Sequence, residues 1–430
     1  MENNLPLEAQ SILDDLTVQI QRSPWRYSTK SELVPLGEFF LLQGEEPKQV
    51  LKLCYDQALK SDPKNVEAIK AIARMAVDKS DTKVASEAIE RGMKITEGDP
   101  ELFALAAEVW SSADRGKSRE YLNKALEINP NLISALLMQA ESFMDAEGYA
   151  QAIEVLAKVE SINPGHPQLW ALRAAIAHLQ GAYSDEGNFR SRAFGLRKLN
   201  PVVDHKIGKH LSLHYRFAEG AQYQQRALAM DSKFHPARTQ LAQDLLRLGR
   251  EEEGWEMVEL ARKADPYHVT CYNLQILKEE LAKYSTIEVP GFVIRMDAVE
   301  SKVFGPEVVK ILQEARELLG TKYKVQLNEP IVVELFSRQR DFAVRTFGLP
   351  GGEGFLGVCF GNVITANSPT ALSVDHNWKS VLWHEYCHVI TLNLTSNRMP
   401  RWLSEGISVY EERGHRPNWG EPANPIYIQW

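Results

Sequence analysis

The sequence lacks the features of three broad classes of protein. No stretch of its 430 residues approaches the twenty consecutive apolar residues that a membrane-spanning helix needs. Positive charge is not in excess either, because 57 Asp and Glu outnumber 49 Lys and Arg, for a net charge of -8. Nucleic-acid-binding domains carry a basic face, and no basic stripe is present. We therefore expect no membrane span and no nucleic-acid partner.

Cysteine is scarce, and a signal peptide is missing. The four cysteines are scattered without paired spacing, at Cys54, Cys271, Cys359 and Cys387, so we expect no disulfide framework. Residues 1–8 lack the basic start and apolar core of a signal peptide. Together these features favour a reducing compartment and predict a cytoplasmic protein. A chain whose signal peptide had been removed would show the same pattern.

A repeat occupies the chain from about residue 31 to residue 284. Each repeat junction is marked by an Asp-Pro, Asn-Pro or Asp-Ser pair. These pairs begin at Asp62, Asp99, Asn129, Asn163, Asn200, Asp231 and Asp265. The steps between these pairs are 37, 30, 34, 37, 31 and 34 residues. They centre on the 34-residue period of the tetratricopeptide repeat. Proline suits such a junction because the next helix starts there without needing its N–H.

The packing positions inside the repeats agree with this period. Small residues recur where paired helices cross and large ones between them, as in Ala140, Phe143, Ala152, Leu156 and Pro164 of one unit and Ala242, Leu245, Gly254, Ala261 and Pro266 of another. The pattern resembles the tetratricopeptide repeat and predicts a mostly α protein with an α-solenoid of six or seven repeats over residues 31–284, after a lead-in over residues 1–30. We expect a protein or peptide partner in its concave groove. The alternatives are a rigid spacer or a dock for the chain's own C-terminal domain.

The pattern changes near Tyr284, where β-branched residues and a Pro-Gly pair begin. Strands are expected over residues 292–296 and 331–336, and helices over 306–319, where Gly320 would end the helix, and over 341–347. The segment 355–366 is glycine-spaced and β-prone. Strands followed by two helices predict a small α+β domain over residues 285–430.

The first of these two expected helices, from Trp378 onward and capped by Asp375 or Asn377, contains His-Glu-x-x-His. His384 and His388 lie four residues apart, so on a helix both imidazoles share one face and can reach one metal ion. Glu385 stands beside that face, where a carboxylate can take a proton from a metal-bound water. Cys387 lies on a different face, and we interpret it as a core residue.

A third ligand is available from the following helix. Glu405 lies seventeen residues after His388, and Pro400 fits the first turn of that helix. Glu405 can then complete a site of two histidines and one glutamate with an open position for water. The alternative is an ordinary solvated glutamate.

His-Glu-x-x-His followed by Trp-Leu-Ser-Glu-Gly resembles the gluzincin metallopeptidases, specifically the peptidase MA-like group. The resemblance implies a zincin-like fold, zinc (Zn2+) ligands at His384, His388 and Glu405, and Glu385 as general base. The sequence departs from these relatives in a slightly shorter spacing to the third ligand. It also has Val409 where many relatives have an acidic partner of a ligand histidine, so Glu411 or Glu412 would have to serve.

The resemblance also implies a sheet edge to which the substrate backbone pairs. The segment Gly357, Val358, Cys359 and Phe360 is the candidate for it, and a buried hairpin strand is the equal alternative. Relatives place a further helical subdomain with an oxyanion-stabilising Tyr or His after the third ligand, whereas this chain ends 25 residues after Glu405. Tyr410, His415 and Tyr427 are candidates by residue type, and we interpret Tyr410 as a core residue. The domain is then a truncated, minimal or impaired peptidase.

Two functions follow from this sequence. In the first, the C-terminal domain hydrolyses peptide bonds with zinc, and the solenoid recruits a protein substrate or partner. In the second, the chain is a protein-interaction scaffold whose peptidase-like domain is inactive or incomplete.

Overall fold

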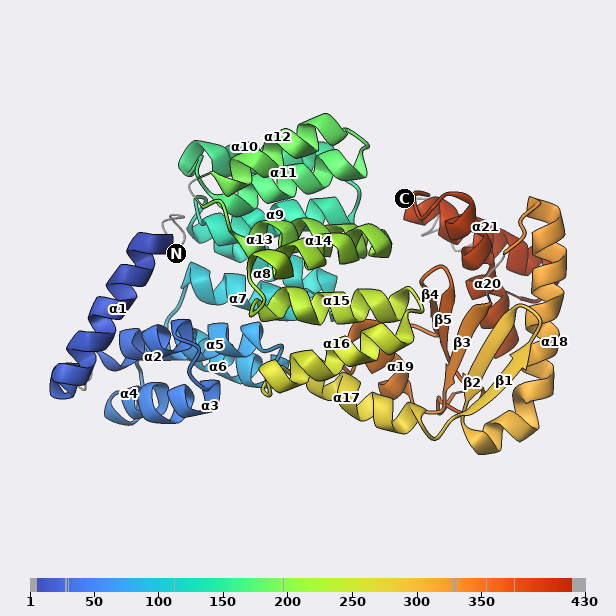
Figure 1. Ribbon diagram of the computed structural model, residues 1–430, viewed down its shortest axis with the longest axis horizontal. Coiled ribbons are helices and arrows are strands. Elements are labelled where there is room, and N and C mark those ends of the chain that lie inside the picture. The colour runs from blue at the N-terminus through green and yellow to red at the C-terminus, as the bar shows by residue number, and fades with distance from the viewer. Residues whose placement is uncertain are drawn as a thin grey trace. The chain divides into compact units, whose positions relative to one another are not determined.

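The computed structural model describes residues 6–419, apart from 28, 30, 112, 196, 328, 329, 353 and 375. Helices fill the chain up to Leu281, and a five-stranded sheet with four more helices follows (Figure 1). The expected fold class, a helical-repeat solenoid followed by a small α+β domain, is confirmed. Over the described ranges, no helix has the length and apolar character needed to cross a bilayer.

The helices before the first strand are α1 (Pro6–Arg22), the 3-10 helix η1 (Pro24–Tyr27), α2 (Leu33–Leu42), α3 (Pro47–Val50), the π-helix η2 (Leu51–Tyr55), α4 (Asp56–Ser61), α5 (Val66–Asp78), α6 (Thr82–Ile95), α7 (Pro100–Trp110), α8 (Arg115–Ile128), α9 (Ile133–Asp145), α10 (Tyr149–Ile162), α11 (Pro167–Leu179), α12 (Tyr183–Phe194), α13 (Pro201–Leu213), α14 (Phe217–Met230), α15 (His235–Arg247), α16 (Glu251–Ala264) and α17 (Val269–Leu281). Asp99 and Pro100 show how such a pair starts a helix. The Asp99 side chain accepts hydrogen bonds from the N–H groups of Glu101 and Leu102, and Pro100 is the first residue of α7. The predicted crossing residues Ala140, Ala152 and Leu156 are fully buried.

The chain packs as two compact units. The first comprises Met1–His210, Tyr223–Ala237 and Asp265–Val269, and the second comprises Leu211–Gln222, Arg238–Ala264 and Thr270–Trp430. The second unit therefore holds most of the last repeat helices as well as the sheet. It also holds the turn between α13 and α14.

The sheet is formed by β1 (Ser285–Val289), β2 (Phe292–Met296), β3 (Ile331–Phe336), β4 (Gly357–Cys359) and β5 (Val363–Asn367), in the order β1-β2-β3-β5-β4 (Figure 1). β2, β3 and β5 run parallel, and the two edge strands β1 and β4 run antiparallel to their neighbours. Residues 292–296 and 331–336 form strands with the predicted bounds. The segment 355–366 forms an edge strand and its inner neighbour.

The first helix of this domain, α18 (Ala298–Tyr323), is longer than the predicted range 306–319. It begins earlier because the Asp297 side chain caps the N–H groups of Val299 and Glu300, so Pro306 lies inside the helix. It also passes through Gly320 and ends at Tyr323, and the cap residue Lys324 adopts the left-handed conformation at φ 56°. Proline and glycine were therefore wrong indicators of its ends.

Each face of the sheet has its own cover. Side chains of α18 and α20 (Trp378–Leu394) pack on the face that presents Ile294, Val333 and Ile364. The opposite face presents Phe336 to α19 (Gln339–Phe347) and to apolar residues of the repeat helices α15, α16 and α17, namely Ala242, Leu246, Val258, Leu274 and Leu277. Within the second unit, the last repeats are thus one layer of the structure that carries the sheet.

Candidate metal centre

Two consecutive helices carry the predicted ligands. The Asn377 side chain caps α20 by accepting a hydrogen bond from the Ser380 N–H at 3.2 Å; the alternative cap, Asp375, lies outside the described residues. Most of α20 is buried, including its apolar residues Leu382, Trp383, Val389 and Ile390. Cys387 is fully buried, as expected. The next helix, α21 (Arg401–His415), starts one residue later than expected, with Pro400 at the N-cap.

The side chains of His384, His388 and Glu405 converge, and one ligand atom of each lies within 4.8 Å of the others. His384 Nε2 is 3.0 Å from His388 Nε2 and 3.2 Å from Glu405 Oε2, and His388 Nε2 is 3.4 Å from the same oxygen. In the part of the chain that the structure describes, this is the one group of three His, Cys, Asp or Glu that converges in this way. Two imidazole nitrogens and a carboxylate facing one point form a donor set that suits zinc.

Each histidine is held through its other ring nitrogen. Glu412 Oε1 contacts His384 Nδ1, and the Ser380 hydroxyl donates to Glu412 Oε2 at 2.6 Å. The Ser404 hydroxyl lies 2.8 Å from His388 Nδ1. Partners of this kind fix the ring orientation of metal-binding histidines and direct both Nε2 atoms towards the ion. The residues present therefore fit zinc.

Sequence reasoning named one of these partners and missed two. Glu412 was one of two acidic candidates; the other, Glu411, instead contacts the Lys322 ammonium at 2.7 Å and the Tyr323 hydroxyl at 2.5 Å. Ser404 was not foreseen, nor was Ser408, whose hydroxyl lies 3.3 Å from His388 Nδ1. Their spacing of four residues on one helical face, next to Glu405, was the available signal.

Negative charge gathers around the two imidazoles. Burial disfavours a charged His384, but hydrogen bonds with Glu405 and Glu412 outweigh it and raise the pKa of His384 to about 10. Burial works against ionisation of Glu405 too, yet the two histidines hold the pKa of Glu405 well below its usual range. Burial raises the pKa of Glu385, which is 6% exposed. A site with three carboxylates and two imidazoles favours a bound cation.

The candidate base lies against the edge strand β4. A Cβ built on Gly357 would lie 2.8 Å from Glu385 Cγ, 2.8 Å from Glu385 Oε1 and 2.7 Å from Val381 Cγ1. The strand backbone can pass this close to Glu385 because glycine has no side chain. Of the other predicted residues of this segment, Cys359 and Phe360 are buried and offer little surface to a ligand.

The predicted oxyanion donors do not gather at the ligands. Tyr410 is 67% exposed, so its interpretation as a core residue is wrong, and its ring lies 5.2 Å from the Lys322 ammonium. The His415 ring stacks on Trp383 with 3.7 Å between the ring centroids. Tyr427 lies outside the described residues.

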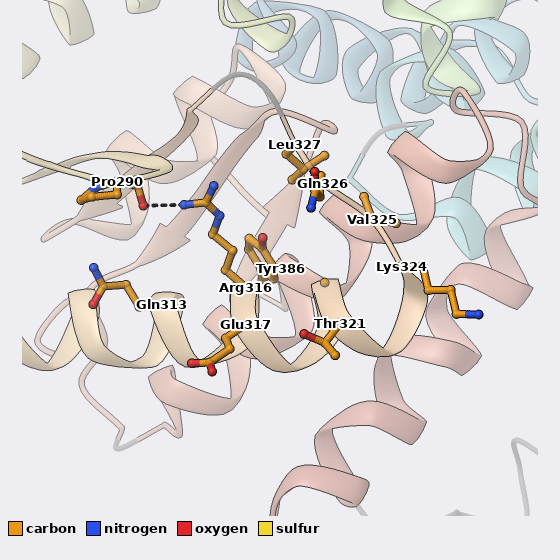
Figure 2. A pocket seen from close by; sticks show the side chains of 11 residues that line it. Pro290, Gln313, Arg316, Glu317, Thr321, Lys324, Val325, Gln326, Leu327 and Tyr386 are labelled. Carbon is orange, nitrogen blue, oxygen red and sulfur yellow. Dashed lines mark hydrogen bonds between the residues drawn. The ribbon is translucent and has the colours of Figure 1, made fainter.

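A hollow lies on another side of α20 and is separate from the ligands. It has a volume of about 750 Å3 and is lined by Tyr386 of α20 and by Arg316, Glu317 and Lys324, among others (Figure 2). Arg316 spans one side of it and donates to the Pro290 carbonyl at 2.7 Å. Tyr386 is two residues from His384 and from His388, so it points away from their face of the helix.

Comparison with known proteins gives distant structural likeness. No family model matches the chain, and no curated protein sequence matches it. Similar solved structures include MamA (18% identity, 38% of this chain and 94% of that chain covered, TM-score 0.30), PilF of Pseudomonas aeruginosa (12%, 47% and 92%, 0.31) and the type IV pilus biogenesis factor PilW (14%, 47% and 94%, 0.32). Likeness at these scores carries no argument, so the assignment of a repeat solenoid rests on the 34-residue period and the paired helices.

Proposed function

We propose that the C-terminal domain is a zinc-dependent peptidase of the gluzincin type, with His384, His388 and Glu405 as the metal ligands. The observation that carries this proposal is the convergence of the three ligand atoms within 4.8 Å. Glu412 and Ser404 contact the Nδ1 atoms of the two histidines and so fix their rings. Bound there, zinc supplies a water of lowered pKa and polarises the substrate carbonyl. The side chain of Glu405 is 45% exposed, which leaves the ligand side open to a substrate.

Glu385 is the general base of the proposed mechanism. It follows His384 directly, and it lies between the ligands and β4. Its carboxylate accepts a proton from the attacking water and later passes that proton to the leaving amine. Burial raises the pKa of Glu385, which makes its carboxylate a stronger base than a solvated glutamate.

β4 positions the substrate in this proposal. As an edge strand it has one side that no described strand pairs with, and an extended peptide can add to that side through backbone hydrogen bonds. Such a peptide would run past Gly357 and therefore past Glu385. β4 is at once the edge strand of the sheet and one arm of a hairpin with β5, and the proposal uses its unpaired edge.

The solenoid recruits a protein partner or substrate in this scheme. Stacked helix pairs form a continuous surface, and proteins of this architecture use it for binding. A second candidate function is a scaffold whose zinc site is structural. The exposure of Tyr410 and the stacked ring of His415 favour it, because they leave α21 without an oxyanion donor.

Metal analysis and one substitution test the proposal. Purified protein should hold about one zinc per chain, and H384A/H388A should hold none. E385Q should keep the metal and lose hydrolysis of unfolded casein, because the amide cannot accept the proton. Equal hydrolysis by E385Q and the parent would contradict the proposal, and zinc binding without hydrolysis by either would favour the scaffold.

A further inference from the structure

The turn between α13 and α14 contains an unexpected tyrosine. Tyr215 has φ 64°, in the left-handed region, where a bulky residue is a rare outlier. Thirty-four residues before and after it lie Gly181 and Gly249, each with φ 76°. Glycine is the usual residue at this position after a helix because it has no Cβ. Thirty-four residues before Gly181 the same position is Glu147, with φ 59°, so a side chain is tolerated there. Tyr215 differs from the adjacent repeats in placing a large aromatic side chain at this turn.

This turn is fixed to the elements that carry the candidate site, within the same compact unit. The Asn397 side chain, just after α20, donates to the Tyr215 carbonyl at 2.7 Å. Phe217 makes an edge-on contact with Phe360, directly after β4, with 5.6 Å between ring centroids. The turn is therefore held both at the end of the ligand helix and at the end of the edge strand.

Arg401 connects the Tyr215 ring to the third ligand. The ring packs, half-buried, against the core formed by the sheet, α18 and α20. The Arg401 guanidinium carbon lies 5.9 Å from the ring centroid, and Arg401 Nε lies 3.8 Å from Glu405 Oε1.

The groups that act on the Tyr215 hydroxyl are those of the site. Burial raises the pKa of Tyr215; Arg401 opposes this, while Glu385 and Glu405 add to it. The phenol therefore stays protonated at neutral pH and can donate a hydrogen bond. Tyr410 and His415 of α21 are engaged elsewhere, as described above.

We infer that Tyr215 belongs to the catalytic site and that its hydroxyl donates a hydrogen bond to the scissile carbonyl oxygen of a bound peptide. This inference rests on the proposed function. When water adds to the carbonyl, the oxygen gains negative charge, and a fixed donor stabilises it more in the transition state than in the ground state. The solenoid then has a direct part in the chemistry beyond recruiting a partner.

Y215F tests this role, and Y410F is the matched control. Phenylalanine removes one hydroxyl but keeps the ring that packs on Arg401 and Phe217. The strain of an aromatic residue at positive φ is the same in both proteins, so the fold is retained. Y410F removes an exposed hydroxyl from the helix that carries Glu405. Each variant is loaded with zinc and assayed with quenched casein, and its affinity for a peptide phosphonate, whose tetrahedral oxygens imitate the oxyanion, is measured by calorimetry.

The expected result for Y215F is unchanged zinc content and KM with kcat lowered about a hundredfold, the usual cost of removing one such donor. Phosphonate affinity should fall by a similar factor, and Y410F should match the parent. If Y215F equals Y410F in kcat and phosphonate affinity while E385Q is inactive, the role of Tyr215 is wrong and the peptidase proposal stands. If E385Q hydrolyses casein like the parent, the proposed function fails, and the role of Tyr215 fails with it.

Discussion

Glu412 gives the sharpest test of how the metal centre is built. It is buried, its Oε1 contacts His384 Nδ1, and its Oε2 accepts from the Ser380 hydroxyl at 2.6 Å. The carboxylate thus fixes which nitrogen of His384 faces the ligand point and makes that nitrogen a better donor. E412Q keeps the shape of the side chain but removes its charge, and the amide must turn one N–H group towards a partner.

Loss of such an outer partner lowers metal affinity about 10- to 100-fold. That range corresponds to about 1.4 to 2.7 kcal/mol of zinc-binding free energy. Zinc affinity is measured by titration against a chromophoric chelator at a fixed pH. The thermal unfolding of zinc-stripped protein shows whether the variant still folds.

The neighbouring Glu411 supplies the control. It is equally buried, but its carboxylate contacts Lys322 and Tyr323 of α18 and none of the ligand histidines. E411Q should therefore affect folding stability and leave zinc affinity at the parental value. Parental zinc affinity in E412Q, or the same loss in both variants, would refute the assignment of Glu412 as the residue that orients His384.

Three further outcomes are expected. G357A should retain zinc but lose about a hundredfold in casein hydrolysis, because its new methyl group would displace the proposed base, whereas G354A, which meets nothing within 4 Å, should behave like the parent. Burial raises the pKa of Asp244 to about 7, so the folded state holds a proton that the unfolded state releases near pH 4. The free energy of unfolding should then fall by at most about 4 kcal/mol as the pH rises from about 4 to 7, and urea titrations should show this slope flattened in D244N. R345A should lower the free energy of unfolding by about 3 to 5 kcal/mol, since it leaves Glu334, 2.7 Å away and almost fully buried, with only the more distant Arg295, at 3.5 Å, as an opposite charge; a loss below 1 kcal/mol in urea titration would contradict this.

The sequence was most informative where function imposes local spacing. His384 and His388 share a helical face because of their four-residue separation, and the structure brings them to Glu405 as that spacing predicts. The repeat period likewise marked the helix pairs. Both signals depend on positions close together in the chain, which a pattern in one sequence can reveal.

One error, the placing of Tyr410 in the core, occurs where the usual rule for burial reverses. On α21 the buried side chains are polar, Ser404, Ser408, Glu411 and Glu412, while apolar Val409 is 41% exposed. Tyr410 was assigned to the core because aromatic residues are usually buried. Here the inward face of the helix faces the proposed metal site, so the polar residues take that face. Tyr215 could not be found in this way, since it lies 169 residues before His384 and no local pattern connects them.

The boundary seen in the sequence near residue 284 is a change of secondary structure, and the packing of the sheet places the folding unit elsewhere. Phe336, Phe342 and Val344 are buried against the repeat helices α15, α16 and α17. Cutting the chain at residue 284 would expose these side chains, at about 1.5 to 3 kcal/mol for each. That sum is comparable to the whole stability of a typical domain. The same cut would remove the turn that carries Tyr215. The last repeats are therefore required by the sheet as a packing layer and, in the proposed mechanism, by the site as the source of a hydrogen-bond donor.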